Sequence, residues 1–166
     1  AKKFWPGPLT MILPKSELVP DSITCGLSSV AICMPDNPLL MGMLKNVYSP
    51  VATSSANIAG TPCSTTFQHA KDDFDGRVDA IDGGSCKMGI EPTVISLTGK
   101  VPRLIRPGLI TLNELEAVIG RIEVDRMVMS KLKRTSMVGT PGVLNKKYAP
   151  KTKLVVMKGT TERFCY

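Results

Sequence analysis

The apolar segments of this chain are short, and that feature constrains its fold more than any other. Runs of four to six residues rich in Val, Ile, Leu and Met stand between turns that contain Pro, Gly, Asn or Asp. Runs of this length, closed by such turns, predict β-strands. None approaches the roughly 18 residues that a membrane-spanning helix needs. The predicted strands cover residues 9–13, 29–34, 50–53, 78–81, 93–97 and 103–106.

Capping signals predict three helices among these strands. Asn37 followed by Pro38 is typical of an N-cap and a first helical position, and apolar spacing extends that helix to about residue 47. Two further pairs, Thr65 with Gln68 and Thr111 with Glu114, have the spacing of a capping box and predict helices that end near residues 74 and 119. Because strands alternate with helices in some places and follow one another in others, we expect an α/β fold with a mixed sheet.

Charge and apolar patterning divide the chain into parts. Residues 1–99 carry 7 Lys and Arg against 9 Asp and Glu, whereas residues 100–166 carry 14 against 5. A basic half attracts polyanions such as ATP or RNA, although a solvated basic surface explains the charge equally well. The apolar pattern stops at residue 126 and resumes with a strand-like run at 153–157. The predicted division is therefore a main domain at 1–125, a basic linker at 126–152 and the start of a second domain at 153–166.

The cysteines and the N-terminal segment indicate a cellular compartment. The five cysteines are scattered, odd in number and form no C-x-x-C pair, which argues against a disulfide framework or a zinc site. No charged leader precedes a long apolar stretch, so we expect no signal peptide, although the opening Ala1-Lys2-Lys3 lacks a Met and leaves the true start open. We expect reduced thiols and a cytoplasmic protein.

Two turns are candidates for phosphate binding. A strand that runs into Ser54-Ser55-Ala56-Asn57 leaves backbone N–H groups for an anion nest, although the same residues suit any tight turn. Arg106-Pro107-Gly108 would hold a forked, permanently charged donor at a sheet edge, with a surface Arg before a turn as the alternative. We interpret His69 as a surface helix residue, and Asp72, Asp73 and Asp75 as a solvated helix end rather than a cation site.

Taken in chain order, seven segments resemble motifs of the YrdC-like family. The resemblance begins with F-W-P-G-P-L-T at residues 4–10 and V-A-I-C-M-P at 30–35, and continues with V-A-T-S-S-A-N at 51–57 and G-T-P-C-S-T at 60–65. It ends with G-I-E-P-T-V at 89–94, L-I-R-P-G at 104–108, and T-P-G with K-Y-A-P between 140 and 150. Seven motifs in order make the resemblance specific. The chain resembles the later part of a YrdC-like domain, followed by the linker of the family's long form.

The resemblance implies a fold and an activity. The fold would be an open, twisted, mixed α/β sheet of the YrdC-like type, incomplete at its N-terminus. The activity would be that of an L-threonylcarbamoyladenylate synthase, a nucleotidyltransferase of tRNA modification. Threonine and bicarbonate form a carbamate that attacks the α-phosphate of ATP and releases pyrophosphate. The implied partners are ATP as a substrate, L-threonine, bicarbonate and a tRNA-modifying transferase, with Mg²⁺ left open and no membrane.

The resemblance also implies site residues at the positions that match its motifs. Residues expected on the ATP side are Ser29, Ser55, Asn57, Cys63, Arg106 and Tyr148, and those expected on the threonine side are Thr53, Cys33 and Pro92. Cys33 replaces an Arg that would pair with the threonine carboxylate, and a thiol cannot reproduce that charged fork. Pro92 replaces a Ser and loses its hydroxyl. We expect no metal ligands and no acid–base catalysts among these residues.

Two alternatives to an active enzyme follow from the same residues. A YrdC-like surface without catalysis would bind tRNA or double-stranded RNA, which the basic second half supports. The absence of an RNA-binding signature in the sequence ranks this alternative lower. A degenerate relative, stable only with a partner, is supported by Cys33 and Pro92. This chain alone, without the family's front half, is expected to be inactive.

Overall fold

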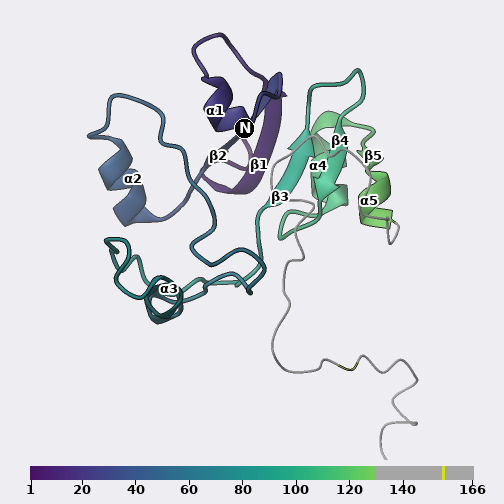
Figure 1. Cartoon of the computed structure of the whole chain (residues 1–166). Helices are drawn as coiled ribbons and strands as arrows, with labels where there is room; N and C mark the ends of the chain where they lie inside the picture. The colour runs from purple at the N-terminus through teal and green to yellow at the C-terminus, as the bar shows by residue number, and fades with distance from the viewer. Residues whose placement is uncertain (130–154, 156–166) are drawn as a thin grey trace, which may run out of the picture.

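A five-stranded mixed sheet forms the centre of the described part of the chain (Figure 1). The computed structural model describes residues 1–129 and residue 155. The strands lie in the order β2-β1-β3-β4-β5. β1 pairs antiparallel with β2 and parallel with β3, whereas β3 and β4 are antiparallel and β4 and β5 parallel. Their bounds are β1 Gly7–Pro14, β2 Ser29–Met34, β3 Thr93–Ser96, β4 Arg103–Arg106 and β5 Glu123–Val124. The predicted mixed α/β fold is confirmed.

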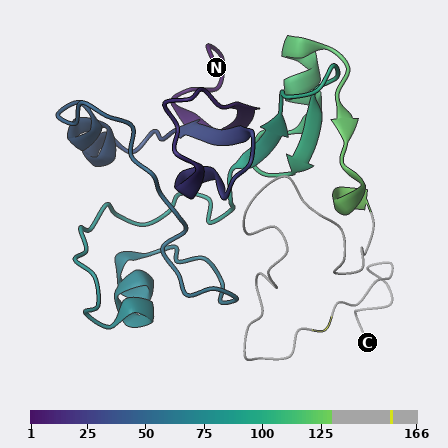
Figure 2. The same ribbon diagram turned by 45° about the horizontal axis from the view of Figure 1, so that its top comes forward.

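Five helices accompany the sheet in the described part of the chain. They are α1 Asp21–Thr24, α2 Pro38–Leu44, α3 Phe67–Phe74, α4 Leu112–Ile119 and α5 Arg126–Met129. The long segment between β2 and β3 carries α2 and α3, and both views place these two helices away from the sheet (Figures 1 and 2). None of the described helices is long and apolar enough to cross a membrane.

The main hydrophobic cluster lies on one face of the sheet. Strand alternation puts Leu9 and Met11 of β1 on the same face, where they meet Ile95 of β3 and Leu104 of β4. Leu115 of α4 belongs to the same buried cluster, so α4 covers this face. The opposite face carries the intervening residues, of which Ile12 and Val94 are buried as well.

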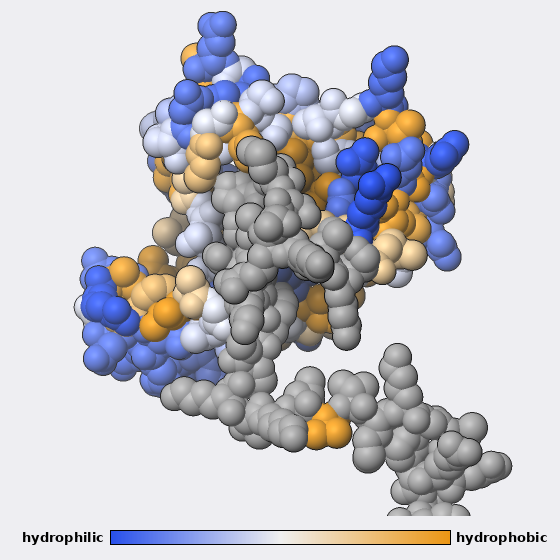
Figure 3. Space-filling view, turned by 45° about the vertical axis from the view of Figure 1, so that its right-hand side comes forward, coloured by the Kyte–Doolittle hydropathy of each residue, from blue (hydrophilic) through white to orange (hydrophobic). Residues whose placement is uncertain are grey.

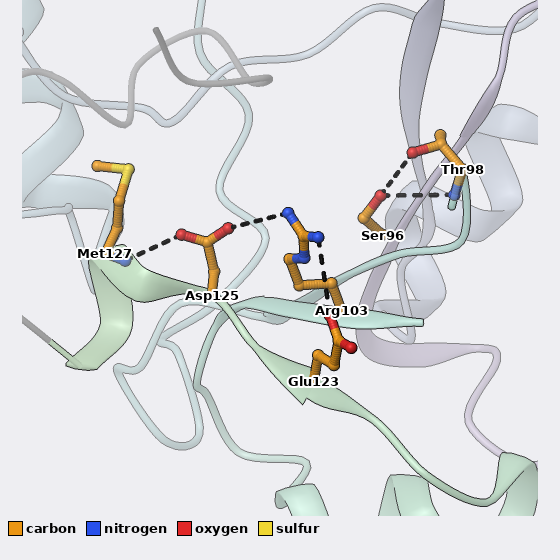
Figure 4. Close-up of polar contacts among 6 residues, drawn as sticks. All are labelled: Ser96, Thr98, Arg103, Glu123, Asp125 and Met127. Carbon is orange, nitrogen blue, oxygen red and sulfur yellow. Dashed lines mark hydrogen bonds and ion pairs between the residues drawn. The ribbon is translucent and has the colours of Figure 1, made fainter. Parts of the chain in front are cut away.

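Ion pairs of Arg103 link β4 to β5, the strand at one edge of the sheet. Arg103 of β4 lies between Glu123 of β5, at 3.7 Å, and Asp125, at 3.8 Å (Figure 4). The second carboxylate oxygen of Asp125 accepts a hydrogen bond from the backbone N–H of Met127 at 2.9 Å. Arg103 therefore ties β5 and the start of α5 to β4.

The segment between β2 and β3 exposes many large apolar side chains. Figure 3 shows hydrophobic patches among hydrophilic residues on one face of the molecule. The exposed apolar side chains of this segment include Leu39, Met43, Val47, Val51, Val78, Ile81 and Ile90. These residues therefore contribute little to the core described above.

Two predicted strands are wrong. Residues 50–53 and 78–81 have extended, apolar sequences, but both run as irregular chain. Val51 is 51% exposed and Ile81 is 63% exposed, so neither run packs on a core face. A strand needs a neighbouring strand to receive its backbone hydrogen bonds, and none of the five strands in the described residues takes either run as a partner.

The helices agree with the prediction more closely. α2 has Asn37 as its N-cap, with the side chain accepting from Leu40 N at 3.0 Å, but it ends at Leu44 instead of residue 47. The capping box of Thr111 and Glu114 at α4 is confirmed. The box predicted at Thr65 is wrong, because Thr66 is the N-cap of α3 and its hydroxyl accepts from His69 N at 3.3 Å.

The predicted linker and second domain lie almost wholly outside the described residues. Only 126–129 of the predicted linker is described, and these residues form α5. In the predicted second domain only Val155 is described, and it is exposed.

Candidate functional site

An ion pair between Arg106 and Glu91 is the centre of the candidate site. Arg106 is the last residue of β4, and its guanidinium donates to the Glu91 carboxylate. The Nε and Nη2 atoms of the same guanidinium both donate to the backbone carbonyl of Pro92, at 3.1 and 2.9 Å. The side chain of Arg106 is 33% exposed and that of Glu91 only 13%. The guanidinium is therefore held by several bonds while part of it still faces outward.

Glu91 has a second partner on the other side of its carboxylate. The Sγ atom of Cys63 donates to Glu91 Oε1 at 3.0 Å, while Oε2 receives Arg106. The three side chains thus form a chain from thiol to carboxylate to guanidinium. Each comes from a different segment, so the chain joins the loop before α3 to the start of β3 and the end of β4.

These three side chains line a pocket of about 840 Å³. Its walls come from residues 61–65, the first and second turns of α3, the Gly89–Glu91 segment and the Arg106-Pro107 corner. The volume is in the range of small-molecule sites, which are concave and carry a few fixed polar groups. A guanidinium in such a wall suits an anionic group such as phosphate.

The backbone beneath the ion pair is tightly packed. A Cβ atom on Gly108 would lie 2.6 Å from the carbonyl oxygen of Glu91 and 2.5 Å from the backbone nitrogen of Thr93. Thr93 is fully buried, and its hydroxyl donates to Ile110 O at 2.8 Å and accepts from Ile110 N at 3.1 Å. The segments that carry Glu91 and Arg106 are thus fastened to each other on both sides of Gly108.

The loop that carries Asn57 is closed by its own hydrogen bonds. The amide nitrogen of Asn57 donates to the carbonyl oxygens of Ile58, at 2.9 Å, and Thr61, at 3.1 Å. Asp73 of α3 then accepts from Ile58 N and from the hydroxyl of Thr61, both at 3.3 Å. Asp73 therefore pins this loop to α3, and the interpretation of Asp73 as merely solvated is corrected.

One row of register partners crosses four strands of the sheet. Thr10 of β1 is the register partner of both Cys33 of β2 and Val94 of β3, and Val94 is the partner of Arg106 of β4. Register partners share a face of the sheet. Cys33 and Arg106 thus end this row, three strand spacings or roughly 14 Å apart, and the β-bulge between Val94 and Ile95 interrupts the alternation next to Arg106. Ser29, four residues before Cys33 along β2, lies on the same face of the sheet as Cys33.

The structure gathers some of the predicted site residues and separates others. Cys63 and Arg106 line the pocket, and Pro92 contributes the carbonyl that holds the guanidinium. Asn57 closes the neighbouring loop, whereas Thr53 and Ser55 are exposed in irregular chain and do not line this pocket. Cys33 and Ser29 lie on the sheet face described above. Tyr148 lies outside the described residues, and the binding roles of all nine residues stay predictions.

Sequence reasoning missed the two carboxylates that organise the site. Glu91 stood inside a recognised motif, and Asp73 within an acidic group, but neither was assigned a contact. A signal for Glu91 was available, since it is a single acid set between Ile90 and Pro92, directly before an apolar strand. Charged groups in such positions are usually paired.

The remaining titratable candidates are His69 and the other thiols. His69 is exposed on α3, its Nδ1 atom lies 3.2 Å from the hydroxyl of Thr65, and its side chain lines the pocket with Cys63 and Arg106. Among residues 1–129, no group of three or more His, Cys, Asp or Glu side chains is arranged to hold a metal ion. Cys25, Cys33 and Cys86 are exposed thiols.

Comparisons with known proteins give the same answer as the motifs. The Sua5/YciO/YrdC family model, described as "Telomere recombination", matches residues 1–108. The chain is 43% identical over 164 residues to threonylcarbamoyl-AMP synthase of Pyrococcus abyssi, and 42% identical over 164 residues to that of Bacillus subtilis. The alignments cover 98% of this chain but 48% and 46% of the two relatives. The chain therefore spans about half the length of the curated relatives it matches.

Solved structures extend this agreement to the fold. The crystal structure of P. abyssi Sua5 complexed with L-threonine matches with a TM-score of 0.89 and 42% identity, over 98% of this chain and 47% of that chain. The crystal structure of E. coli YciO matches with a TM-score of 0.54 and 27% identity, over 63% and 52% of the two chains. Sheet, pocket and sequence define an α/β protein of the YrdC-like class. The chain belongs to the Sua5/YciO/YrdC family, which confirms the resemblance inferred from its motifs.

Proposed function

We propose that the protein to which this chain belongs is an L-threonylcarbamoyladenylate synthase. It would convert ATP, L-threonine and bicarbonate into threonylcarbamoyl-AMP and pyrophosphate. The observation that carries the proposal is the 43% identity, over 98% of this chain, to a relative named threonylcarbamoyl-AMP synthase. The match to P. abyssi Sua5, a structure that contains L-threonine, supports the amino-acid half of the reaction.

The pocket at Arg106 supports the nucleotide half. In the proposed reaction the carboxylate of a threonine carbamate attacks the α-phosphate of ATP, and pyrophosphate leaves. Such a transfer depends on holding the reactants in line and on stabilising negative charge at phosphorus. The Arg106 guanidinium, fixed by Glu91 and Pro92 in the pocket wall, is the described group best placed for that charge. ATP is the substrate, and Mg²⁺, its usual companion, would be bound mainly through phosphate oxygens.

Threonine would bind on the side of the sheet face that carries Cys33. The row from Cys33 to Arg106 spans four strands, which gives room for an amino acid beside a nucleotide. Thr53 and Pro92 are the other proposed threonine contacts. Because Cys33 has no charge to offer a carboxylate, we expect weaker threonine binding than an Arg at that position would give.

The proposed partners follow from the reaction. Threonylcarbamoyl-AMP is an activated acyl donor, so a transferase must move its threonylcarbamoyl group to tRNA. We propose the cytoplasm as its location, which suits the exposed thiols of Cys25, Cys33 and Cys86.

Pyrophosphate release tests the proposal directly. The complete protein should release pyrophosphate only when ATP, threonine and bicarbonate are all present. Arg106→Ala should lower that rate by about tenfold or more, because a charge-assisted contact to phosphate is lost. Arg103→Ala is a matched control, since Arg103 lies on the same strand but pairs with Glu123 and Asp125. A complete wild-type protein that releases no pyrophosphate would contradict the proposal.

RNA binding is a second candidate, supported by charge. Residues 130–166 carry nine Lys and Arg against one Glu. Phosphate contacts of this kind make RNA affinity fall steeply with salt. The complete protein should therefore bind tRNA in the absence of ATP, with an affinity that drops as salt rises. An affinity that ignores salt would argue against an electrostatic RNA surface.

A further inference from the structure

We infer that Glu91 is a positioning residue that fixes the guanidinium of Arg106 for nucleotide binding. The inference deepens the proposed function and rests on it for the identity of the ligand. The contacts between Glu91 and Arg106 do not depend on the proposed function. Glu91 is the one carboxylate that contacts Arg106 in the described residues, and it does so from a side chain that is only 13% exposed.

Glu91 and Pro92 contact different parts of the Arg106 guanidinium. The carbonyl of Pro92 takes the Nε and Nη2 donors along one edge of the guanidinium, and Glu91 takes Nη1 at the other end. Contacts at both ends fix the plane of the guanidinium as well as its position. A guanidinium has five N–H donors, so these three bonds do not exhaust it.

The Glu91 carboxylate is itself held in place by a further contact. A surface carboxylate that pairs with an Arg by chance would not be held in this way. Cys63 donates to the oxygen of Glu91 that faces away from Arg106. The backbone of Glu91 packs against Gly108, two residues after Arg106, within 2.6 Å of where a Cβ would be. Glu91 and Arg106 therefore move as one unit, and the loss of the carboxylate leaves one end of the guanidinium without its anchor.

A negative charge beside a phosphate site has two opposite consequences. It repels the phosphates of ATP, and it also holds the cation that attracts them. If repulsion dominated, Glu91→Gln would bind ATP more tightly than the wild type. If positioning dominates, as we infer, Glu91→Gln binds ATP about tenfold more weakly, because the ordering of a long Arg side chain must then be supplied by the ligand.

A double-mutant cycle separates a positioning role from a merely structural one. ATP affinity is measured by calorimetry for the complete wild-type protein, Glu91→Gln, Arg106→Ala and the double variant, without threonine or bicarbonate. If Glu91 acts through Arg106, Glu91→Gln has no further effect once Arg106 is Ala. Tighter or unchanged binding in Glu91→Gln, or additive losses in the double variant, would overturn the inference. Glu123→Gln is the matched control, because it removes a carboxylate from Arg103 at the far edge of the sheet.

A second readout does not depend on the reaction or on ATP. The side-chain Nε–H of Arg106 gives an NMR signal that is assigned by its loss in Arg106→Ala. This Nε–H donates to Pro92 O, and that bond should open more often once Glu91 no longer holds the other end of the guanidinium. Its hydrogen exchange with water should therefore be accelerated about tenfold or more in Glu91→Gln and unchanged in Glu123→Gln. An unchanged exchange rate in Glu91→Gln would overturn the inference. A wild type that shows this coupling but releases no pyrophosphate would overturn the proposed function alone.

Discussion

The backbone of Gly108 passes so close to Thr93 that a methyl group on Gly108 would lie 2.5 Å from the Thr93 nitrogen. Backbone atoms cannot move aside as a flexible side chain can. Gly108→Ala should therefore lower the free energy of unfolding by about 3 kcal/mol or more and weaken ATP binding with it. Thermal unfolding and calorimetry check both effects.

Gly42 offers a matched control for that substitution. It lies inside α2 with open space around its Cβ direction. Gly42→Ala should raise the free energy of unfolding by about 0.5–1 kcal/mol, since Ala favours a helix more than Gly does. A Gly108→Ala protein as stable as Gly42→Ala would contradict the packing described here.

The buried hydroxyl of Thr93 serves both backbone groups of Ile110. Thr93→Val keeps the shape but leaves an N–H and a carbonyl buried without that partner. It should cost about 1–3 kcal/mol in denaturant unfolding, the usual cost of unsatisfied buried groups. Thr93→Ser, which keeps the hydroxyl and loses a methyl group, should cost less. Equal losses in the two variants would show that packing, rather than hydrogen bonding, sets the role of Thr93.

Asp73 pins the loop that carries Asn57, although Asp73 lies on α3. Asp73→Ala should release that loop and weaken ATP binding about tenfold, because the loop must then be ordered on binding. Asp36→Ala removes the same charge at an exposed position ahead of α2 and should leave binding unchanged. Similar effects from the two variants would mean that overall charge, not the loop, governs affinity.

The capping box of α4 predicts a pH dependence of stability. Hydrogen bonds from the Thr111 backbone and hydroxyl hold the pKa of Glu114 below its ordinary value of 4.5. A lowered pKa means that the ionised carboxylate stabilises the fold above pH 4.5, and that this contribution is lost as pH falls through the lower value. Glu114→Gln should therefore be less stable than the wild type near neutral pH, with a difference that shrinks in acid.

Thermal unfolding over a pH series checks that this pH dependence comes from Glu114. The four proteins compared are the wild type, Glu114→Gln, Thr111→Val and the double variant. In a Thr111→Val background the hydroxyl that bonds to Glu114 is gone, so the pH-dependent effect of Glu114→Gln should be smaller. An effect of the same size in both backgrounds would place its origin elsewhere.

The sequence predicts the sheet well where strands have neighbours. Runs 9–13, 29–34, 93–97 and 103–106 become paired strands because each finds a partner within the sheet. Runs 50–53 and 78–81 have the same local character, and what distinguishes them is that no strand among residues 1–129 pairs with them. β5 and α1, by contrast, form in the structure although their sequences did not predict them. They are too short to show a period, and β5 is defined by its pairing with β4.

The candidate site is predicted in part for a similar reason. Arg106 and Cys63 belong to recognisable motifs, and the structure brings both to one pocket. Their link through Glu91 depends on how three separate segments approach one another, which no single motif contains. Asp73 likewise gains its role only when α3 meets the Asn57 loop.

The parallel pairing of β1 with β3 sets the order in which this sheet can be made. It joins position 9 to position 93, with α2 and α3 on the chain between them. A growing chain that has not yet reached β3 holds, of these five strands, only the β1–β2 hairpin, and a lone hairpin is barely stable in water. The centre of the sheet therefore forms only after β3 has been made and a long loop has closed, and pairing across such a loop is slower than local pairing. The apolar face of β1 gains its cover from α4 later still, and until then it is a surface that a chaperone would protect.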